Sequence, residues 1–360
     1  MPLNQIKKLS EVFIKKIDKI EIDANKCVRV RSVLSQCQAC QTVCPIDSIE
    51  ISNERLMLPS TCLECGLCTA VCPTNALRWN NPPLLQLYYR WMNQSGQKFV
   101  ITCDPMLKSY RDTSVETVPC LGLVPAELWL ALGQRFSEIQ LVCTPESCAS
   151  CEVTTGFAQL KKALTEAHLP EGLVYFSQSV QNQEREIDYD RRRLLSGWFE
   201  EMKETHTIAV KEMLEVQPAM TPFEKFERYV RERDQLEEMA EEVNAIKLSV
   251  IDRLLQDTLI YTDKRQILLD VLKQHEKLNT TVEVQLPKVT KDCTLCKACA
   301  FLCPTEALYI DEDSFILAPS KCVACHLCEE ICWDKHITLQ TYPAKILQKK
   351  YIFLHQQPNV

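Results

Sequence analysis

Glycine is scarce in this chain of 360 residues, which contains only 7, and no run of about 20 apolar residues occurs. The longest apolar candidate, LGLVPAELWLALG, contains Pro125 and Glu127, so we expect no membrane span. A phosphate-binding glycine loop, a G-x-G-x-x-G motif after a strand and a Ser-His-Asp pattern are also missing. Dinucleotide binding and serine-hydrolase chemistry are therefore poor hypotheses.

Positive charge is in deficit, because 41 Lys and Arg residues face 48 Asp and Glu, for a net charge of −7. Nucleic-acid binding needs a basic face, so the composition argues against it. The first residues, MPLNQIKKLSEVFIKKIDKIEI, lack the apolar run and cleavage site of a signal peptide. We expect a cytoplasmic, globular protein of two or three domains, since 46% of residues are hydrophobic and 25% charged.

Cysteine is abundant, with 21 residues in three groups and none between 152 and 292. The first group is Cys27, Cys37, Cys40, Cys44, Cys62, Cys65, Cys68 and Cys72. The second is Cys103, Cys120, Cys143, Cys148 and Cys151, and the third is Cys293, Cys296, Cys299, Cys303, Cys322, Cys325, Cys328 and Cys332. Without an export signal, such spacing indicates metal binding rather than disulfides.

The first and third groups are copies of one unit. CPIDSIEISNERLMLPSTCLECGLC aligns with CPTEALYIDEDSFILAPSKCVACHLC, and SNER and DEDS are typical of hairpin turns between short strands. Cys-x2-Cys-x2-Cys followed by Cys-Pro suits a [4Fe-4S] cluster, with the fourth cysteine directed to a second cluster. Zinc, which prefers paired Cys-x2-Cys elements, and purely structural cysteines are the weaker alternatives.

The motifs CTLCKACAFLCP and CVACHLCEEICW resemble those of bacterial two-cluster ferredoxins, and we place the two copies at 27–78 and 288–340. The resemblance implies one cluster on Cys293, Cys296, Cys299 and Cys332, and another on Cys322, Cys325, Cys328 and Cys303. Trp333 replaces the usual proline, and we expect it to shield the neighbouring cluster from water. His326 either donates a hydrogen bond to a cluster sulfur or is a solvent-facing loop residue.

The N-terminal copy departs from the family pattern, because LSQCQACQTVCP has Leu34 at the position of the first cysteine. Either that cluster is [3Fe-4S], or Cys27 supplies the ligand through a longer loop, which we favour. The resemblance then implies clusters on Cys27, Cys37, Cys40 and Cys72, and on Cys62, Cys65, Cys68 and Cys44. Arg29 and Arg31 either screen the cluster's negative charge or are ordinary surface residues.

The middle of the chain alternates apolar runs with helical spacing. KFVITCD, VETVPC, EIQLVC and GLVYFS predict strands, and the segments between them predict a small α/β domain with a parallel sheet. PCLGLVPAELWLALGQRFSEIQLVCTPESCASC is similar to the delta subunit of methyl-viologen-reducing hydrogenases, which carries a [2Fe-2S] cluster. The resemblance favours Cys103, Cys120, Cys143 and Cys148 as ligands, with Cys151 doubtful. Zinc, a redox-active Cys148–Cys151 pair and inert buried cysteines remain open.

The complete prediction is a multidomain α+β protein. We expect an N-terminal helix/strand arm (1–26), a ferredoxin-like module (27–95) and a small α/β domain (96–182). A helical spacer or docking segment (183–285), a second ferredoxin-like module (286–345) and a C-terminal tail (346–360) complete the chain. The function expected is electron transfer through four [4Fe-4S] clusters and a [2Fe-2S] cluster, as a subunit rather than a free-standing enzyme.

The expected partners are an oxidoreductase with a flavin, molybdenum or nickel site, as in anaerobic metabolism, and a soluble electron donor or acceptor. A ferredoxin-fed thiol/disulfide reductase and an iron–sulfur redox sensor are the alternative functions. The central cysteines would be the catalytic dithiol in the first of these.

Overall fold

The computed structural model describes residues 19–52, 55–107, 115–177, 261–290, 292–310 and 314–356. All of them belong to one compact unit, which is built from 1–179 and 250–360. Most of the expected helical segment 183–285, and most of the expected arm 1–26, lie outside the described residues. Within the described ranges, none of the helices combines the length and the apolar character that a membrane span requires.

The N-terminal cysteine region (residues 20–79) is built from two antiparallel strand pairs and short helices. Strand β1 (Ile20–Ile22) pairs with β4 (Leu77–Trp79), and β2 (Glu50–Ile51) pairs with β3 (Leu56–Met57). Between them lie the short helices η1 (Ala24–Lys26), α2 (Val28–Arg31), α3 (Ala39–Val43) and α4 (Leu67–Val71). The buried side chains of Leu67 and Leu77 hold α4 against β4.

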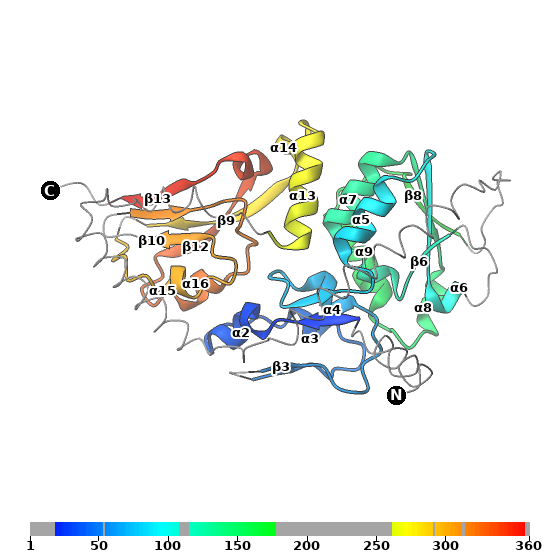
Figure 1. The fold of residues 1–360 in the computed structure, drawn as a ribbon, viewed down its shortest axis with the longest axis horizontal. Helices are drawn as coiled ribbons and strands as arrows, with labels where there is room; N and C mark the ends of the chain where they lie inside the picture. Colours follow the sequence, from blue (N-terminus) through cyan, green and yellow to red (C-terminus); the bar gives the residue numbers. More distant parts are fainter. Residues whose placement is uncertain are drawn as a thin grey trace, which may run out of the picture. The chain divides into compact units, whose positions relative to one another are not determined.

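The C-terminal cysteine region (residues 283–343) repeats this order of elements (Figure 1). Strand β9 (Glu283–Val289) pairs with β12 (Ile337–Pro343), and β10 (Leu308–Ile310) pairs with β11 (Ser314–Leu317). Helices α15 (Ala298–Phe301) and α16 (Leu327–Ile331) take the places of α3 and α4. Both regions therefore place a short helix directly before each Cys-Pro or Cys-Trp cysteine.

The residues expected as a C-terminal tail are part of the fold. After η3 (Ala344–Gln348), strand β13 (Ile352–Gln356) pairs antiparallel with β11. Ile352 and Leu354 pack against the buried core, and this apolar contact holds the segment on the fold. The expectation of a tail from 346 is corrected accordingly.

In the sequence between the two cysteine regions lies a parallel sheet in the order β6-β5-β7-β8. Its strands are β5 (Lys98–Cys103), β6 (Glu116–Val118), β7 (Glu138–Val142) and β8 (Val174–Ser177), with α6 (Asp104–Leu107), η2 (Leu121–Leu123) and α8 (Pro145–Ala149) at its ends. Strand β7 lies between β5 and β8 in the sheet and is buried along almost its whole length.

One face of this sheet is covered by α5 (Leu84–Met92), α7 (Ala126–Arg135) and α9 (Gly156–Glu166) (Figure 1). The fully buried rings of Trp91 and Phe99 lie 5.3 Å apart, centroid to centroid, where α5 meets β5. Helix α13 (Asp263–Gln274) packs on α7 and α5, and α14 (Leu278–Thr281) follows it. Although α13 belongs to the segment expected as a spacer or docking arm, it is packed into the fold.

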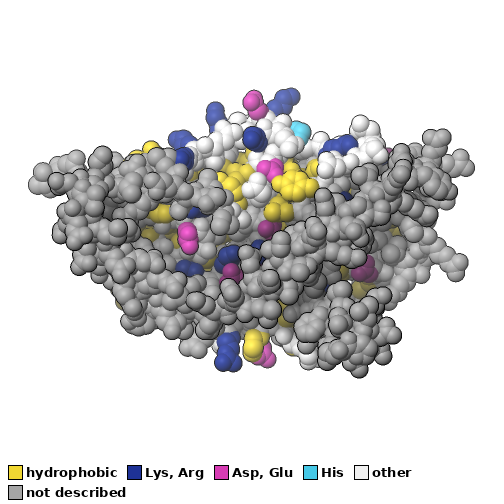
Figure 2. Space-filling model, in the orientation of Figure 1, with side chains coloured by type: hydrophobic (Ala, Val, Ile, Leu, Met, Phe, Trp, Pro, Cys, Tyr) yellow, Lys and Arg dark blue, Asp and Glu magenta, His cyan; other side chains and the backbone are white. Residues whose placement is uncertain are grey.

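The surface shown in Figure 2 carries charges of both signs. Lysine and arginine side chains lie among aspartate and glutamate side chains over the described part of this face. The described side chains on this face therefore show charges of both signs side by side.

Candidate metal centres

Four cysteines of the N-terminal cysteine region surround one cavity. We call Cys44, Cys62, Cys65 and Cys68 the Cys44 quartet. The space between the protein atoms there, including the part open to solvent, is about 340 Å³, and its apolar lining includes Ile20, Ile46, Ile49, Leu58 and Leu67. A group that binds in this cavity is held by sulfur and surrounded by hydrocarbon.

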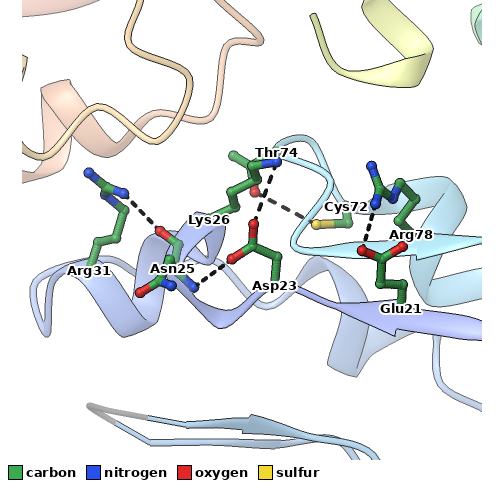
Figure 3. A network of polar contacts seen from close by, with 8 residues as sticks. All are labelled: Glu21, Asp23, Asn25, Lys26, Arg31, Cys72, Thr74 and Arg78. Carbon is green, nitrogen blue, oxygen red and sulfur yellow. Dashed lines mark hydrogen bonds and ion pairs between the residues drawn. The ribbon is translucent and has the colours of Figure 1, made fainter. Parts of the chain in front are cut away.

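A second cavity, of about 350 Å³, shows whether Cys27 or residue 34 lies near the other cysteines of the first motif. It is lined by the Cys27 quartet, which consists of Cys27, Cys37, Cys40 and Cys72. Cys27 is buried at 8% exposure, whereas Leu34 is 52% exposed and does not line the cavity. Thr74 lies beside this quartet, with Oγ1 3.8 Å from the Cys72 Sγ (Figure 3). The fold thus brings Cys27 to the other three cysteines.

The C-terminal cysteine region encloses an equivalent cavity of about 370 Å³. It is lined by the Cys303 quartet, which consists of Cys303, Cys322, Cys325 and Cys328. The backbone N–H of Ala307 donates to the Cys303 Sγ at 3.3 Å. His326 also lines the cavity, but its Nδ1 pairs with the Glu329 Oε2 at 3.0 Å.

The remaining four cysteines, the Cys293 quartet (Cys293, Cys296, Cys299 and Cys332), also lie together. Burial raises the pKa of Cys299 to about 12, and the charges of the other three thiols add to this rise. The backbone N–H of His336 donates to the Cys332 Sγ at 3.3 Å. Cys296 is exposed, so this quartet opens to solvent.

Trp333 does not shield this quartet, contrary to the expectation from the sequence. Its side chain is 89% exposed. Helix α16 ends at Ile331, the chain turns with Lys335 in the left-handed conformation, and the indole is directed into solvent. Adjacency to a ligand in the sequence therefore does not place the side chain over the ligand.

Three of the four cysteine loops share an unusual backbone. Each Cys-x2-Cys-x2-Cys loop has positive φ at the residue before and the residue after its second cysteine, namely at Glu64 and Gly66, Leu295 and Lys297, and Ala324 and His326. Such alternation curls successive backbone N–H groups around an anion. The loop through Leu34, Cys37 and Cys40 has no positive φ, and there Cys27 approaches from upstream.

The donor chemistry of the quartets fits iron–sulfur clusters. Burial raises the pKa of Cys40 to about 12 and of Cys322 to about 11, so bare thiolates are disfavoured and a cation is needed to hold them. Beside Cys322, the Nη1 of Arg265 is buried with no acceptor in the protein, as expected for a donor that faces a bound anionic group. Among the described residues, no three cysteine, histidine or carboxylate side chains converge on a single metal ion.

The five central cysteines gather at the carboxyl ends of the parallel strands. Cys103 ends β5, Cys143 follows β7, and Cys148 lies in α8, just after the Thr144 cap. The charge of Cys148 acts on the thiols of both Cys103 and Cys120. Ligands bind at this edge of open α/β sheets.

Two members of this group are hydrogen-bonded to each other. The Cys143 thiol donates to the Cys148 sulfur, which lowers the pKa of Cys148 to about 7 and, together with burial, raises that of Cys143. The charge of Cys151 acts on Cys103, so this fifth cysteine is close by as well. The structure brings all five candidates together and does not by itself single out four.

Two buried cations on α13 were not singled out from the sequence. Lys264 and Arg265 are only 7% and 8% exposed, and they donate to backbone carbonyls of Cys72 and Cys322, respectively. The one available signal was an adjacent Lys-Arg pair in a helical segment, which on most helices indicates a solvated face.

Comparison with known proteins supports one of these regions directly. A family described as the 4Fe-4S binding domain matches residues 58–78, which contain Cys62, Cys65, Cys68 and Cys72. No curated protein and no solved structure matches the chain. The chain therefore carries an iron–sulfur domain of the ferredoxin type, which supports a general role in electron transfer.

Proposed function

We propose that this protein relays single electrons through four [4Fe-4S] clusters, one in each cysteine quartet. The observation that carries the proposal is that three separate cavities are each lined by four cysteines, with the fourth quartet gathered in the same way. The 4Fe-4S match over residues 58–78 supports cluster binding in this stretch, which holds three cysteines of the Cys44 quartet and one of the Cys27 quartet. The fold proposed is two ferredoxin-like modules joined to a small α/β domain.

Within this proposal, the chain's residues bind the clusters, shield them and set their potentials. When bound, each cluster accepts and releases one electron without the making or breaking of a bond. The apolar linings keep water away from the inner sides of the cavities, while backbone N–H groups donate to sulfur, as from Ala307 to Cys303 and from His336 to Cys332. Such donors and the degree of burial set reduction potentials.

The central cysteines form a fifth redox centre in this proposal, a [2Fe-2S] cluster held by Cys103, Cys120, Cys143 and Cys148. Its support is the convergence of these thiols at the carboxyl edge of the sheet. Electrons would pass between a soluble carrier and a partner oxidoreductase with a flavin, molybdenum or nickel site. In this role the chain is a cytoplasmic subunit rather than a complete enzyme.

The test is anaerobic isolation of the full chain with iron, sulfide and zinc analysis and EPR of the dithionite-reduced protein. We expect about 16 iron atoms per chain from the four cubane clusters, or about 18 with the central cluster. The absorption in the visible range should bleach on reduction. A colourless preparation that contains zinc and no acid-labile sulfide would overturn the proposal.

A second candidate function, a thiol or disulfide reductase, has one observation in its favour. The Cys143 and Cys148 thiols lie within hydrogen-bond reach of each other, and the backbone N–H of Cys151 donates to the Cys148 carbonyl at 3.2 Å. Reduction of a disulfide to two thiols takes two electrons, which the clusters would supply one at a time, and two protons, which solvent would supply. If Cys148→Ser or Cys151→Ser abolishes turnover of a small disulfide while the cluster spectra stay intact, this function replaces the relay.

A further inference from the structure

One arginine joins the two cysteine regions. Arg31, the last residue of α2, donates from Nε to the Leu302 carbonyl at 3.0 Å and from Nη2 to the preceding carbonyl at 3.3 Å. From Nη1 it donates to the Asn25 carbonyl at 2.8 Å (Figure 3). Because Asn25 lies two residues before Cys27 and Leu302 directly precedes Cys303, a single guanidinium connects chain segments that supply ligands to different quartets.

Helix α13 makes the same connection with two consecutive residues. Lys264 donates from Nζ to the Ala70 carbonyl at 2.9 Å and to the Cys72 carbonyl, in the N-terminal cysteine region. Arg265 donates from Nη2 to the Cys322 carbonyl, in the C-terminal cysteine region. Both side chains are buried, so their charges are screened little by water.

The two regions also meet through their cysteine loops. The backbone N–H of Gln36, directly before Cys37, donates at 3.2 Å to the Oε1 of Glu330, which lies in α16 two residues after Cys328. On the other side, the partly buried guanidinium of Arg31 donates to the carbonyl of Leu302, directly before Cys303. Arg31 remains a cation in this partly buried position, since arginine does not deprotonate in proteins. The Cys27 quartet and the Cys303 quartet therefore face each other across this contact.

We propose that Arg31, Lys264 and Arg265 form a junction across which the clusters of the Cys27 and Cys303 quartets exchange electrons directly. The three cations raise the reduction potentials of these two inner clusters. The inference rests on the proposed function and adds an order of transfer and a set of positioning residues to it. An electron that crosses the junction oxidises one cluster and reduces its neighbour, and no proton or leaving group is involved.

The remaining neighbours extend the relay in both directions. Adjacent groups are joined by packed elements: η2, which follows Cys120, packs on α4, which carries Cys68. Helix α4 also packs on α3, which carries Cys40, and α15, with Cys299, packs on α16, with Cys328. The order is thus the central cysteines, then the Cys44, Cys27, Cys303 and Cys293 quartets. The exposed Cys296 marks the end that a soluble carrier can reach.

The potential of the inner clusters follows from electrostatics. Reduction adds one negative charge to a cluster, and a nearby buried cation stabilises that charge more strongly than an exposed one. Arg265 adds an unpaired buried Nη1 next to Cys322, a donor that is available to a cluster sulfur. No corresponding set of buried cations occurs at the Cys293 quartet among the described residues. The inner clusters should therefore be reduced before the exposed outer one.

The test compares Arg31→Gln with Arg31→Lys in the full, iron-loaded chain. Redox titration followed by EPR should show a downward shift of the inner-cluster midpoints in Arg31→Gln and weaker magnetic interaction between the two inner clusters. Arg31→Lys should keep the midpoints close to those of the wild type. The midpoint of the Cys303 cluster is assigned by its absence from Cys322→Ala.

Arg29→Gln is the matched control. Arg29 lies on the same helix and lines the Cys27 cavity, but its Nη1 donates to the Gln41 Oε1 at 2.8 Å, within its own region. Loss of the Arg29 charge should shift the midpoint potential of the Cys27 cluster and leave the midpoint potential of the Cys303 cluster unchanged. If Arg31→Gln loses iron, Lys264→Gln replaces it, with the exposed Lys273→Gln as control on the same helix.

The outcomes separate the two proposals. Full iron content with unchanged midpoints and unchanged magnetic interaction in both Arg31→Gln and Lys264→Gln overturns the junction and leaves the electron-transfer function standing. Absence of iron and sulfide from the wild-type chain overturns the function itself. A shift confined to the Cys27 cluster in Arg31→Gln also counts against the junction, because Arg31 would then act as Arg29 does.

Discussion

A Cβ atom at Gly156 would lie 2.5 Å from the Sγ of Cys120, well inside van der Waals contact. The same position is 3.2 Å from the Val153 Cγ1, so the neighbours leave little room to move. Gly156 begins α9, and its missing side chain is what allows Cys120 to join the other central cysteines. The central group thus depends on a residue that carries no chemistry of its own.

We expect Gly156→Ala to disturb the central group without affecting the four quartets. Alanine favours helices over glycine by about 0.8–1 kcal/mol, but overpacking costs about 1–3 kcal/mol, so the net effect should be a lower melting temperature. Alkylation followed by mass spectrometry should show faster labelling of Cys120. Gly96→Ala is the control, because Gly96 has a φ of 99° and no neighbour within 4 Å, so its strain is local. Equal labelling of Cys120 in both variants would contradict the prediction.

Cys27 should be essential for one cluster, and Leu34 should be unable to replace it. In Cys27→Ala we expect either a loss of about four iron atoms or conversion to a [3Fe-4S] cluster with its own EPR signal in the oxidised protein. The other quartets should keep their iron. Iron analysis and EPR measure both results.

The double variant Cys27→Ala with Leu34→Cys makes the sharper comparison. It restores the cysteine spacing of the ferredoxin pattern, but residue 34 is exposed and lies outside the cavity. We therefore expect no recovery of the lost iron. Full recovery would mean that the loop can adopt the usual path and that Cys27 is dispensable.

Cys148 should be the most reactive central thiol once metal is removed. Its pKa is lowered to about 7 by the hydrogen bond from Cys143, so it is largely thiolate at slightly alkaline pH. The rate of iodoacetamide labelling should rise with a midpoint near pH 7 and move toward the ordinary value of 9.0 in Cys143→Ala. If the iron-loaded chain labels at the same rate as the metal-free chain, Cys148 holds no metal and the thiol function gains support.

The spacing of the cysteines predicts their grouping because it restricts where the chain can place its sulfur atoms, and three of the expected groups each line a cavity in the structure. The four apolar runs of the middle segment are strands β5 to β8, since β-branched residues in short runs have few other stable arrangements. Lys297 and His326 have left-handed backbone conformations at the positions where the N-terminal copy has Gly66, and neither residue type predicts such a conformation. There the tight loop overrides the local backbone preference.

The junction could not be predicted, because its partners are far apart in the sequence. Lys264 contacts residues more than 190 positions away, and Arg31 contacts residues about 270 positions away. Helical periodicity identifies a buried face but not what covers that face. From the sequence alone, a buried Lys264–Arg265 pair therefore looks the same as a pair that faces solvent. Strand β13 was missed for a similar reason, although its apolar residues Ile352 and Leu354 offered a signal.

The final prediction concerns pH and metal removal. A buried thiol whose pKa is higher in the folded than in the unfolded chain binds its proton more tightly when folded. Mainly through burial, the pKa of Cys40 rises from 9.0 to about 12 and the pKa of Cys322 from 9.0 to about 11. Their contribution to stability is complete below pH 9 and is lost as the pH rises from 9 toward 11 or 12.

We therefore expect the melting temperature of the metal-free chain, followed by circular dichroism, to fall as the pH rises from about 9 to about 11. The iron-loaded chain is the control, because its ligands have already given up their protons to bind metal and have none left to lose. Its melting temperature should change much less over the same interval. An equal fall in both forms would show that other groups cause the alkaline loss, and that the buried thiols are not what the metal stabilises.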